Sequence, residues 1–90
     1  MIKITKILNY GGACPFQINA LTDDNRIIYG RYRGGSIKVY IGKNGDLTDD
    51  EVIDGRLIFQ EDNGDPNDGY MRLTDFKYKT KSVLDWSETN

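Results

Sequence analysis

Two runs of alternating apolar and polar residues meet at a Gly-Gly pair, and they form the clearest structural signal in the chain. Residues 26–33 and 36–42 are rich in β-branched and aromatic side chains and flank Gly34-Gly35. A Gly-Gly loop permits the positive φ angles of the type I′ and II′ turns that join paired strands. The pattern therefore predicts a β-hairpin over residues 26–42.

The hairpin register assigns each side chain to one of two faces, because successive side chains of a strand point in opposite directions. In this register Arg33 opposes Ser36 and Ile28 opposes Ile41. One face is apolar and is expected to join the core: Ile28, Gly30, Tyr32, Ile37, Val39 and Ile41. The other, called the basic face below, carries cations and aromatic rings: Tyr29, Arg31, Arg33, Lys38 and Tyr40.

Two further strands are expected before the hairpin. Residues 2–8 predict a strand that changes face near Lys6 through a bulge, and the Asn and Gly residues of 9–12 favour a turn. A second strand is expected over 16–21, because the preceding Pro15 lacks an amide hydrogen and suits a strand start.

The loop between the second strand and the hairpin has two alternatives. A three-residue loop over 23–25, with Asn25 in the left-handed region, sets Phe16, Ile18 and Ala20 against the apolar face of the hairpin. A two-residue loop would shift the register by one residue and turn polar side chains toward that face, which burial disfavours. The three-residue loop is preferred, and Gln17, Asn19 and Leu21 then extend the basic face.

The middle of the chain has weaker patterns. Thr48-Asp-Asp-Glu51 has the form of a capping box and predicts a short helical turn near 48–54. Residues 56–60 fit either a brief strand or an extended segment. The polar run 61–69 is expected to be a loop.

The last apolar residues follow helical spacing. They predict a helix over about 75–85, within a segment 73–87, that packs Phe76, Val83 and Leu84 on the apolar face of the sheet. A strand over 70–78 is the alternative, although its alternation is poor. Trp86 and Tyr10 are interpreted as core or core-rim residues.

These elements predict one α+β domain over residues 1–90. It is an antiparallel meander of about four strands with a C-terminal helix on one face. Its parts are a basic meander (1–43), an acidic loop-rich segment (44–72) and the helix (73–87). Ninety residues can bury one modest core without metal or disulfide.

The amino-acid composition excludes several kinds of functional site. The chain has no histidine and one cysteine, which excludes an internal disulfide, the usual Cys/His zinc sites and His-dependent triads. A non-enzymatic protein with neither metal nor cofactor is therefore expected. A small hydrolase that uses carboxylates or Cys14 is kept as an alternative, although Cys14 is better explained as a small buried hydrophobe.

The N-terminal residues alternate like a strand and do not resemble a secretory signal. No apolar run approaches the ~20 residues that a membrane span requires. A cytoplasmic protein without membrane contact is therefore expected. The sequence does not indicate an oligomeric state.

Charge is unevenly distributed along the chain. The net charge is −2, but residues 1–43 hold seven Lys/Arg and two Asp, whereas residues 44–90 hold five Lys/Arg and twelve Asp/Glu. Nine of the acidic residues, called the acidic segment below, follow one another with Arg56 as the sole cation among them: Asp46, Asp49, Asp50, Glu51, Asp54, Glu61, Asp62, Asp65 and Asp68. The two regions are expected to meet partners of opposite charge.

Each region has two interpretations. The basic face resembles a platform for nucleic acid, on which cations meet phosphates and rings stack on bases, or it is a solvated outer face with cross-strand pairs. The acidic segment imitates the charge of a nucleic acid and blocks a basic groove, or it docks on a positively charged partner. The other interpretation is a pair of solvated loops that favour solubility. Asn63-x-Asp65-x-Asn67 is spaced like half of a calcium loop but lacks the Gly and Glu that complete one, so no metal site is predicted.

Four stretches carry a resemblance to a known group of sequences. They are Tyr10-Gly-Gly-Ala-Cys-Pro-Phe-Gln17, Asp23-Asp-Asn-Arg26, Tyr29-Gly-Arg-Tyr-Arg-Gly-Gly35 and Asp68-Gly-Tyr-Met71. Together they hold 23 residues between Tyr10 and Met71, and they resemble a pattern in small uncharacterised phage and bacterial proteins. The resemblance implies a mobile-element context, in which small acidic proteins often bind and inhibit host machinery. It supplies no catalytic residues.

The leading hypothesis is accordingly a phage-type accessory protein that binds and inhibits a host protein, such as a component of a defence system. Its contact would be the acidic segment or the polar face of the sheet. The alternative is a nucleic-acid-binding protein that uses the basic face.

Overall fold

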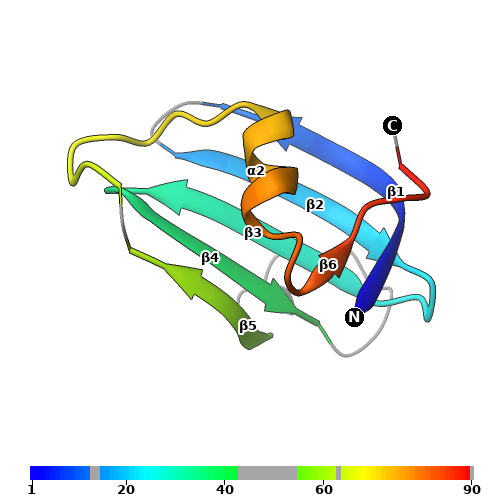
Figure 1. Ribbon diagram of the computed structural model, residues 1–90. Helices are drawn as coiled ribbons and strands as arrows, with labels where there is room; N and C mark the ends of the chain where they lie inside the picture. Colours follow the sequence, from blue (N-terminus) through cyan, green and yellow to red (C-terminus); the bar gives the residue numbers. More distant parts are fainter. Residues whose placement is uncertain (13–14, 43–54, 63, 90) are drawn as a thin grey trace.

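The computed structural model describes residues 1–12, 15–42, 55–62 and 64–89. Its elements are β1 (Ile2–Gly11), β2 (Phe16–Thr22), β3 (Ile27–Arg33), β4 (Ser36–Ile41), β5 (Arg56–Glu61), α2 (Leu73–Lys79) and β6 (Leu84–Asp85). The strands form one sheet in the order β5-β4-β3-β2-β1-β6 (Figure 1). Neighbours are antiparallel except β6, which runs parallel to β1.

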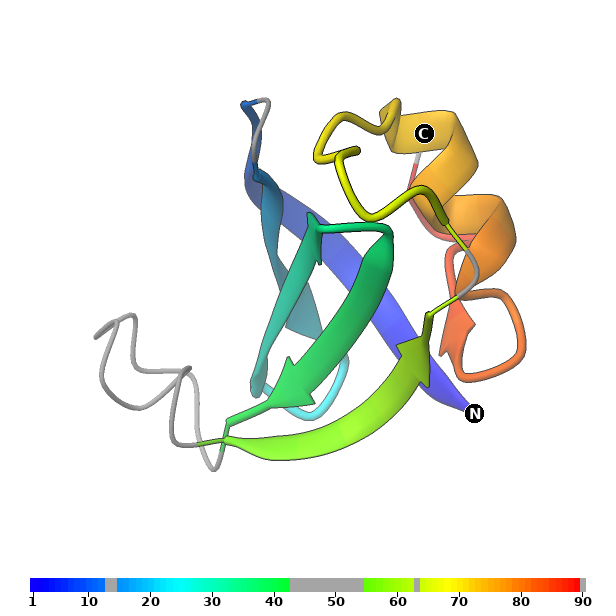
Figure 2. The same ribbon diagram turned by 90° about the vertical axis from the view of Figure 1, so that its left-hand side faces the viewer.

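The helix and the sheet form two layers. Figure 1 shows α2 lying across one face of the sheet, and the view from the side in Figure 2 shows that the sheet curls toward it. The C-terminal strand β6 returns beside the start of β1. The side chains of β3 and β4 that point away from α2 form the second face of the sheet.

The central hairpin has the predicted register. Arg33 pairs with Ser36 and Ile28 with Ile41, and the φ angles of Gly34 and Gly35 are 61° and 76°. Positive φ at both central residues is the signature of a type I′ turn, whose twist matches that of paired strands.

The predicted loop before the hairpin is also confirmed. Asn25 has a φ of 65°, and Phe16 pairs with Tyr32 and Ala20 with Ile28. The apolar faces of β2 and β3 therefore coincide, as burial requires.

The first strand is longer than expected. A register shift between Ile4 and Lys6 confirms the predicted bulge, but the predicted turn at 9–12 is wrong because the strand continues to Gly11. A second shift between Ile7 and Asn9 realigns the chain so that it keeps pairing with β2. Tyr10 is 58% exposed, so its assignment to the core or its rim is wrong.

The sheet has more strands than the predicted meander, and it is mixed. Residues 56–61 form the edge strand β5 on β4, which confirms the strand interpretation of that segment. The two-residue β6 pairs Ile2 with Leu84 and Lys3 with Asp85 in parallel. The expectation of about four, exclusively antiparallel, strands is therefore wrong.

The C-terminal helix is shorter than predicted, and the alternative strand over 70–78 is wrong. The helix α2 ends at Lys79, because buried Thr80 closes it: the Thr80 hydroxyl donates to the Phe76 carbonyl (2.8 Å) and accepts from Trp86 Nε1 (3.1 Å). The chain then turns and Leu84 enters β6. The short helical turn expected near 48–54 lies outside the described residues.

The core is organised around Phe76. Its side chain is fully buried, and its ring lies 5.7 Å from that of Phe16 and 6.0 Å from that of Trp86. A Cβ atom at Gly30 of β3 would lie 2.3 Å from Phe76 Cζ and 2.8 Å from Ile18 Cγ2. The absence of a side chain at Gly30 therefore lets α2 sit directly on the sheet.

The predicted core residues of the C-terminal segment are confirmed. Leu84 is buried, and Val83 and Trp86 are partly buried against the same cluster. The cluster of buried residues comprises Ile4, Phe16, Ile18, Ala20, Ile28, Tyr32, Ile37, Val39, Ile41, Met71, Phe76 and Leu84.

The loop over 64–69 is fixed to the tip of the hairpin. Gly64 donates its amide to the Gly35 carbonyl (2.9 Å), and the Gly35 amide donates to the Asp68 carbonyl (3.0 Å). The buried Tyr32 hydroxyl donates to Asp68 Oδ2 at 3.0 Å. These bonds join the acidic half of the chain to the basic meander.

Replacing Gly30 by Ala should destabilise the protein by about 1–3 kcal/mol, because the new methyl group overlaps the Phe76 ring. Urea unfolding of the variant measures the loss. In a double-mutant cycle with Phe76→Leu, which lacks the overlapping ring atoms, the double variant should lose less stability than the sum of the two single variants. Additive losses would contradict the direct contact.

Burial, together with the hydrogen bond to Asp68 and the charge of that residue, raises the pKa of Tyr32 above its ordinary value of 10.0. The folded state then retains the phenol proton that the unfolded chain releases, so this contribution to stability is complete below about pH 10 and is lost as pH rises through the raised pKa. Urea unfolding should show a free energy that falls more steeply above about pH 10 in the wild type than in Tyr32→Phe. Tyr78→Phe is the control, because Tyr78 is 67% exposed. Its free energy of unfolding should fall with pH as steeply as that of the wild type.

Candidate nucleic-acid interface

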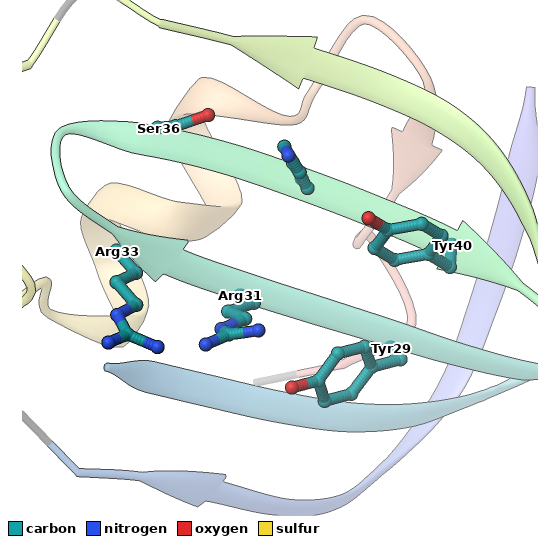
Figure 3. A pocket seen from close by; sticks show the side chains of 6 residues that line it. Tyr29, Arg31, Arg33, Ser36 and Tyr40 are labelled. Atoms are coloured by element: carbon teal, nitrogen blue, oxygen red, sulfur yellow. The ribbon is translucent and has the colours of Figure 1, made fainter. Parts of the chain in front are cut away.

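The basic face forms a hollow on the side of the sheet opposite α2. The hollow has a volume of about 280 Å³, and its walls are side chains that stand on β3 and β4 (Figure 3). It is lined by Tyr29, Arg31, Arg33, Ser36, Lys38 and Tyr40. The structure thus brings together all five residues that the sequence assigns to this face and adds Ser36.

The two tyrosines lie side by side at one end of the hollow. Tyr29 and Tyr40 are directly paired across the hairpin, and their ring centroids are 6.3 Å apart with a tilt of 31°. Figure 3 shows that Arg31 and Arg33 lie nearer the turn, at the other end, and that their side chains extend away from β4. Aromatic surface and positive charge are therefore separated along the same pair of strands.

The cations of the hollow form no ion pair with a carboxylate among the described residues. Arg31 opposes Lys38, a pairing of like charges that costs stability in a sheet unless an anion lies between them. The ion pairs among the described residues involve other cations: Lys3, Arg26, Arg72 and Lys79. The buried Nε of Arg31 also has no hydrogen-bond partner in this part of the chain.

The neighbouring strand extends the face with polar and then apolar groups. Gln17 pairs with Arg31 and Asn19 with Tyr29, as the predicted register requires. Further along, partly buried Leu21 pairs with Ile27, which is 1% exposed. The face is therefore cationic near the hairpin turn and becomes apolar toward the start of β3.

The acidic segment is described only in part. Asp46, Asp49, Asp50, Glu51 and Asp54 lie outside the described residues. Glu61 pairs with Lys79 of α2 at 3.5 Å, and Asp65 accepts the Asn67 amide at 2.9 Å. Asp68 accepts the Tyr32 hydroxyl and the Tyr70 amide. These described carboxylates therefore already form contacts within the molecule.

Asp62 is the acidic residue that borders the basic face. It follows β5 and accepts hydrogen bonds from the Ser36 hydroxyl and from Gln60 Nε2, whose strand position is opposite Lys38. The Ser36 and Gln60 hydrogen bonds, with the nearby charge of Lys38, lower the pKa of this carboxyl. Sequence reasoning placed Asp62 with the acidic segment instead, because the position of β5 beside β4 was not predicted.

A metal site and a catalytic role of Cys14 gain no further support from the described residues. Within the described residues, no group of three or more His, Cys, Asp or Glu side chains is placed to hold a metal ion. In the calcium-like pattern Asn63-x-Asp65-x-Asn67, Asn63 lies outside the described residues. The Asp65 carboxylate accepts the Asn67 amide and so forms a turn. Cys14 also lies outside the described residues.

Two more hollows share Tyr70 in their lining, and neither is lined by a residue of the basic face. One, of about 410 Å³, is bordered by Tyr10 and Arg72, and the other, of about 260 Å³, by Asp68, Asp75 and Lys79. Arg72 forms an ion pair with Asp75 at 3.1 Å. Charges of both signs meet here, so these hollows attract a polyanion less than the basic face does.

No protein-family model, curated protein or solved structure matches the chain. In the described part of the chain, no helix is long and apolar enough to cross a membrane.

Proposed function

We propose that the protein binds single-stranded nucleic acid on its basic face. The observation that carries the proposal is the hollow in which two paired tyrosine rings stand beside three cations without a described ion-pair partner. Proteins that bind single strands combine a positively charged surface for phosphates with aromatic rings on which bases stack. The net charge of −2 does not oppose this, since the local field of the face decides the encounter.

A single strand suits this surface better than a duplex. Reading a duplex requires an element that enters a groove, whereas the basic face consists of side chains on two strands of a sheet. Unpaired bases expose the π-faces that Tyr29 and Tyr40 need for stacking. The protein then acts by binding and not by catalysis.

The other hypotheses have less support from the geometry. Inhibition of a host protein through the acidic segment remains a prediction, but the described members of that segment are engaged within the molecule. The hydrolase alternative depends on Cys14 or on carboxylates, and the described carboxylates of the acidic segment are engaged in the same contacts. A pull-down from host lysate becomes the next experiment if nucleic acid does not bind.

The test is binding of a labelled single-stranded oligonucleotide over a salt series. If Arg31, Arg33 and Lys38 each contact one phosphate, the logarithm of the association constant should fall against the logarithm of salt with a slope of about −2. The double variant Arg31→Gln/Arg33→Gln should bind more weakly, with a slope of about −0.7, because one contact remains.

The matched control is Lys77→Gln/Lys81→Gln, which removes the same charge from the α2 side of the molecule. It should keep the wild-type slope and most of the affinity. The proposal is overturned if the folded wild type binds no oligonucleotide at low salt, or if the control lowers binding as much as the Arg31/Arg33 variant does.

A further inference from the structure

We infer that Asp62 determines the nucleotide preference of the basic face, by accepting a hydrogen bond from a donor group of the bound strand. The donor is a base amino group or a ribose 2′-hydroxyl. The inference rests on the proposed single-strand binding and adds chemical selectivity to it. Thymidine, which has neither group, should be the least favoured nucleotide.

The position of Asp62 supports this role. Its carboxylate accepts from Ser36, which lines the hollow, and from Gln60, which lies opposite Lys38. The side chain is exposed. A single negative charge therefore stands at the rim of a cationic site, within reach of a nucleotide that occupies the hollow.

The carboxylate is also oriented and ionised. Donors from two different strands, Ser36 of β4 and Gln60 of β5, hold it. These bonds and the charge of Lys38 lower the pKa of Asp62, so it remains an anion at neutral pH. A carboxylate fixed in this way loses little conformational freedom when a ligand adds one more bond.

The Asp62 carboxylate can accept a hydrogen bond from one further donor. An ionised carboxylate offers about four lone-pair positions. Oδ1 accepts from the Ser36 hydroxyl and from Gln60 Nε2 at 3.1 Å, and Oδ2 accepts from the same Gln60 nitrogen at 2.9 Å. One position on Oδ2 is left by these bonds among the described residues. An amino N–H or a ribose O–H satisfies it. Phosphate oxygens are repelled, and so are the two carbonyls that flank the single N3–H of thymine.

The experiment compares three oligonucleotides of about 12 residues, a length within the range that one such site covers. Oligo(dT) has neither donor, oligo(dC) has the base amino group and oligo(rU) has the 2′-hydroxyl. We expect the wild type to bind oligo(dC) or oligo(rU) about 10-fold more tightly than oligo(dT), as one hydrogen bond to a charged acceptor predicts. A gain with oligo(dC) alone identifies the base, and a gain with oligo(rU) alone identifies the sugar.

The decisive variant is Asp62→Asn, in which this preference should fall to about 2-fold or less while binding of oligo(dT) becomes stronger. Ser36→Ala, which frees the carboxylate without removing it, should reduce the preference in part. Asp75→Asn is the matched control, because it removes the same charge on α2 and should keep the preference of the wild type.

The outcomes separate the two proposals. If the wild type binds none of the three strands, the proposed function fails and the role of Asp62 fails with it. If the wild type binds but Asp62→Asn has the same ratios of affinity, single-strand binding stands and the role of Asp62 is overturned.

Discussion

The packing of Phe76 against Gly30 is the contact on which the rest of the structure depends. A short helix has little stability of its own, and α2 has only the residues Leu73–Lys79. Its position is determined by the fully buried ring of Phe76, which occupies the space that a side chain at Gly30 of β3 would need. Because the ring reaches the backbone of the sheet, α2 covers the apolar face of the meander and β6 can return to pair with β1.

This arrangement has a consequence for function. With one face of β3 and β4 committed to the core, the alternation of the strands places Tyr29, Arg31 and Lys38 on the other. The type I′ turn determines which residues of β3 and β4 oppose one another. The hollow therefore follows directly from the hairpin register. The loop over 64–69 is bonded to the hairpin tip and to Tyr32, whose side chain lies on the core face of β3.

The predictable features are those that local chemistry specifies. Gly34-Gly35 and Asn25 determined two turns, and alternation then determined the basic face residue by residue. The two-residue β6 is too short to produce a pattern, and the end of α2 depends on hydrogen bonds of buried Thr80 that spacing does not reveal. Asp62 was assigned to the acidic segment by its charge alone. Its neighbours on β4 depend on the pairing of β4 with β5, and this pairing contains a register shift that the sequence pattern does not reveal. The five acidic residues of 46–54 lie outside the described residues.

Binding at the basic face is tested most directly by an NMR titration of the isotopically labelled protein with a single-stranded oligonucleotide. Chemical-shift changes show which backbone amides sense the ligand, independently of any substitution. We expect the largest changes at Arg31, Arg33, Lys38 and Tyr40, with the amides of α2 little affected. Changes concentrated in the loop 64–69 and α2, or no changes at all, would contradict binding at the basic face.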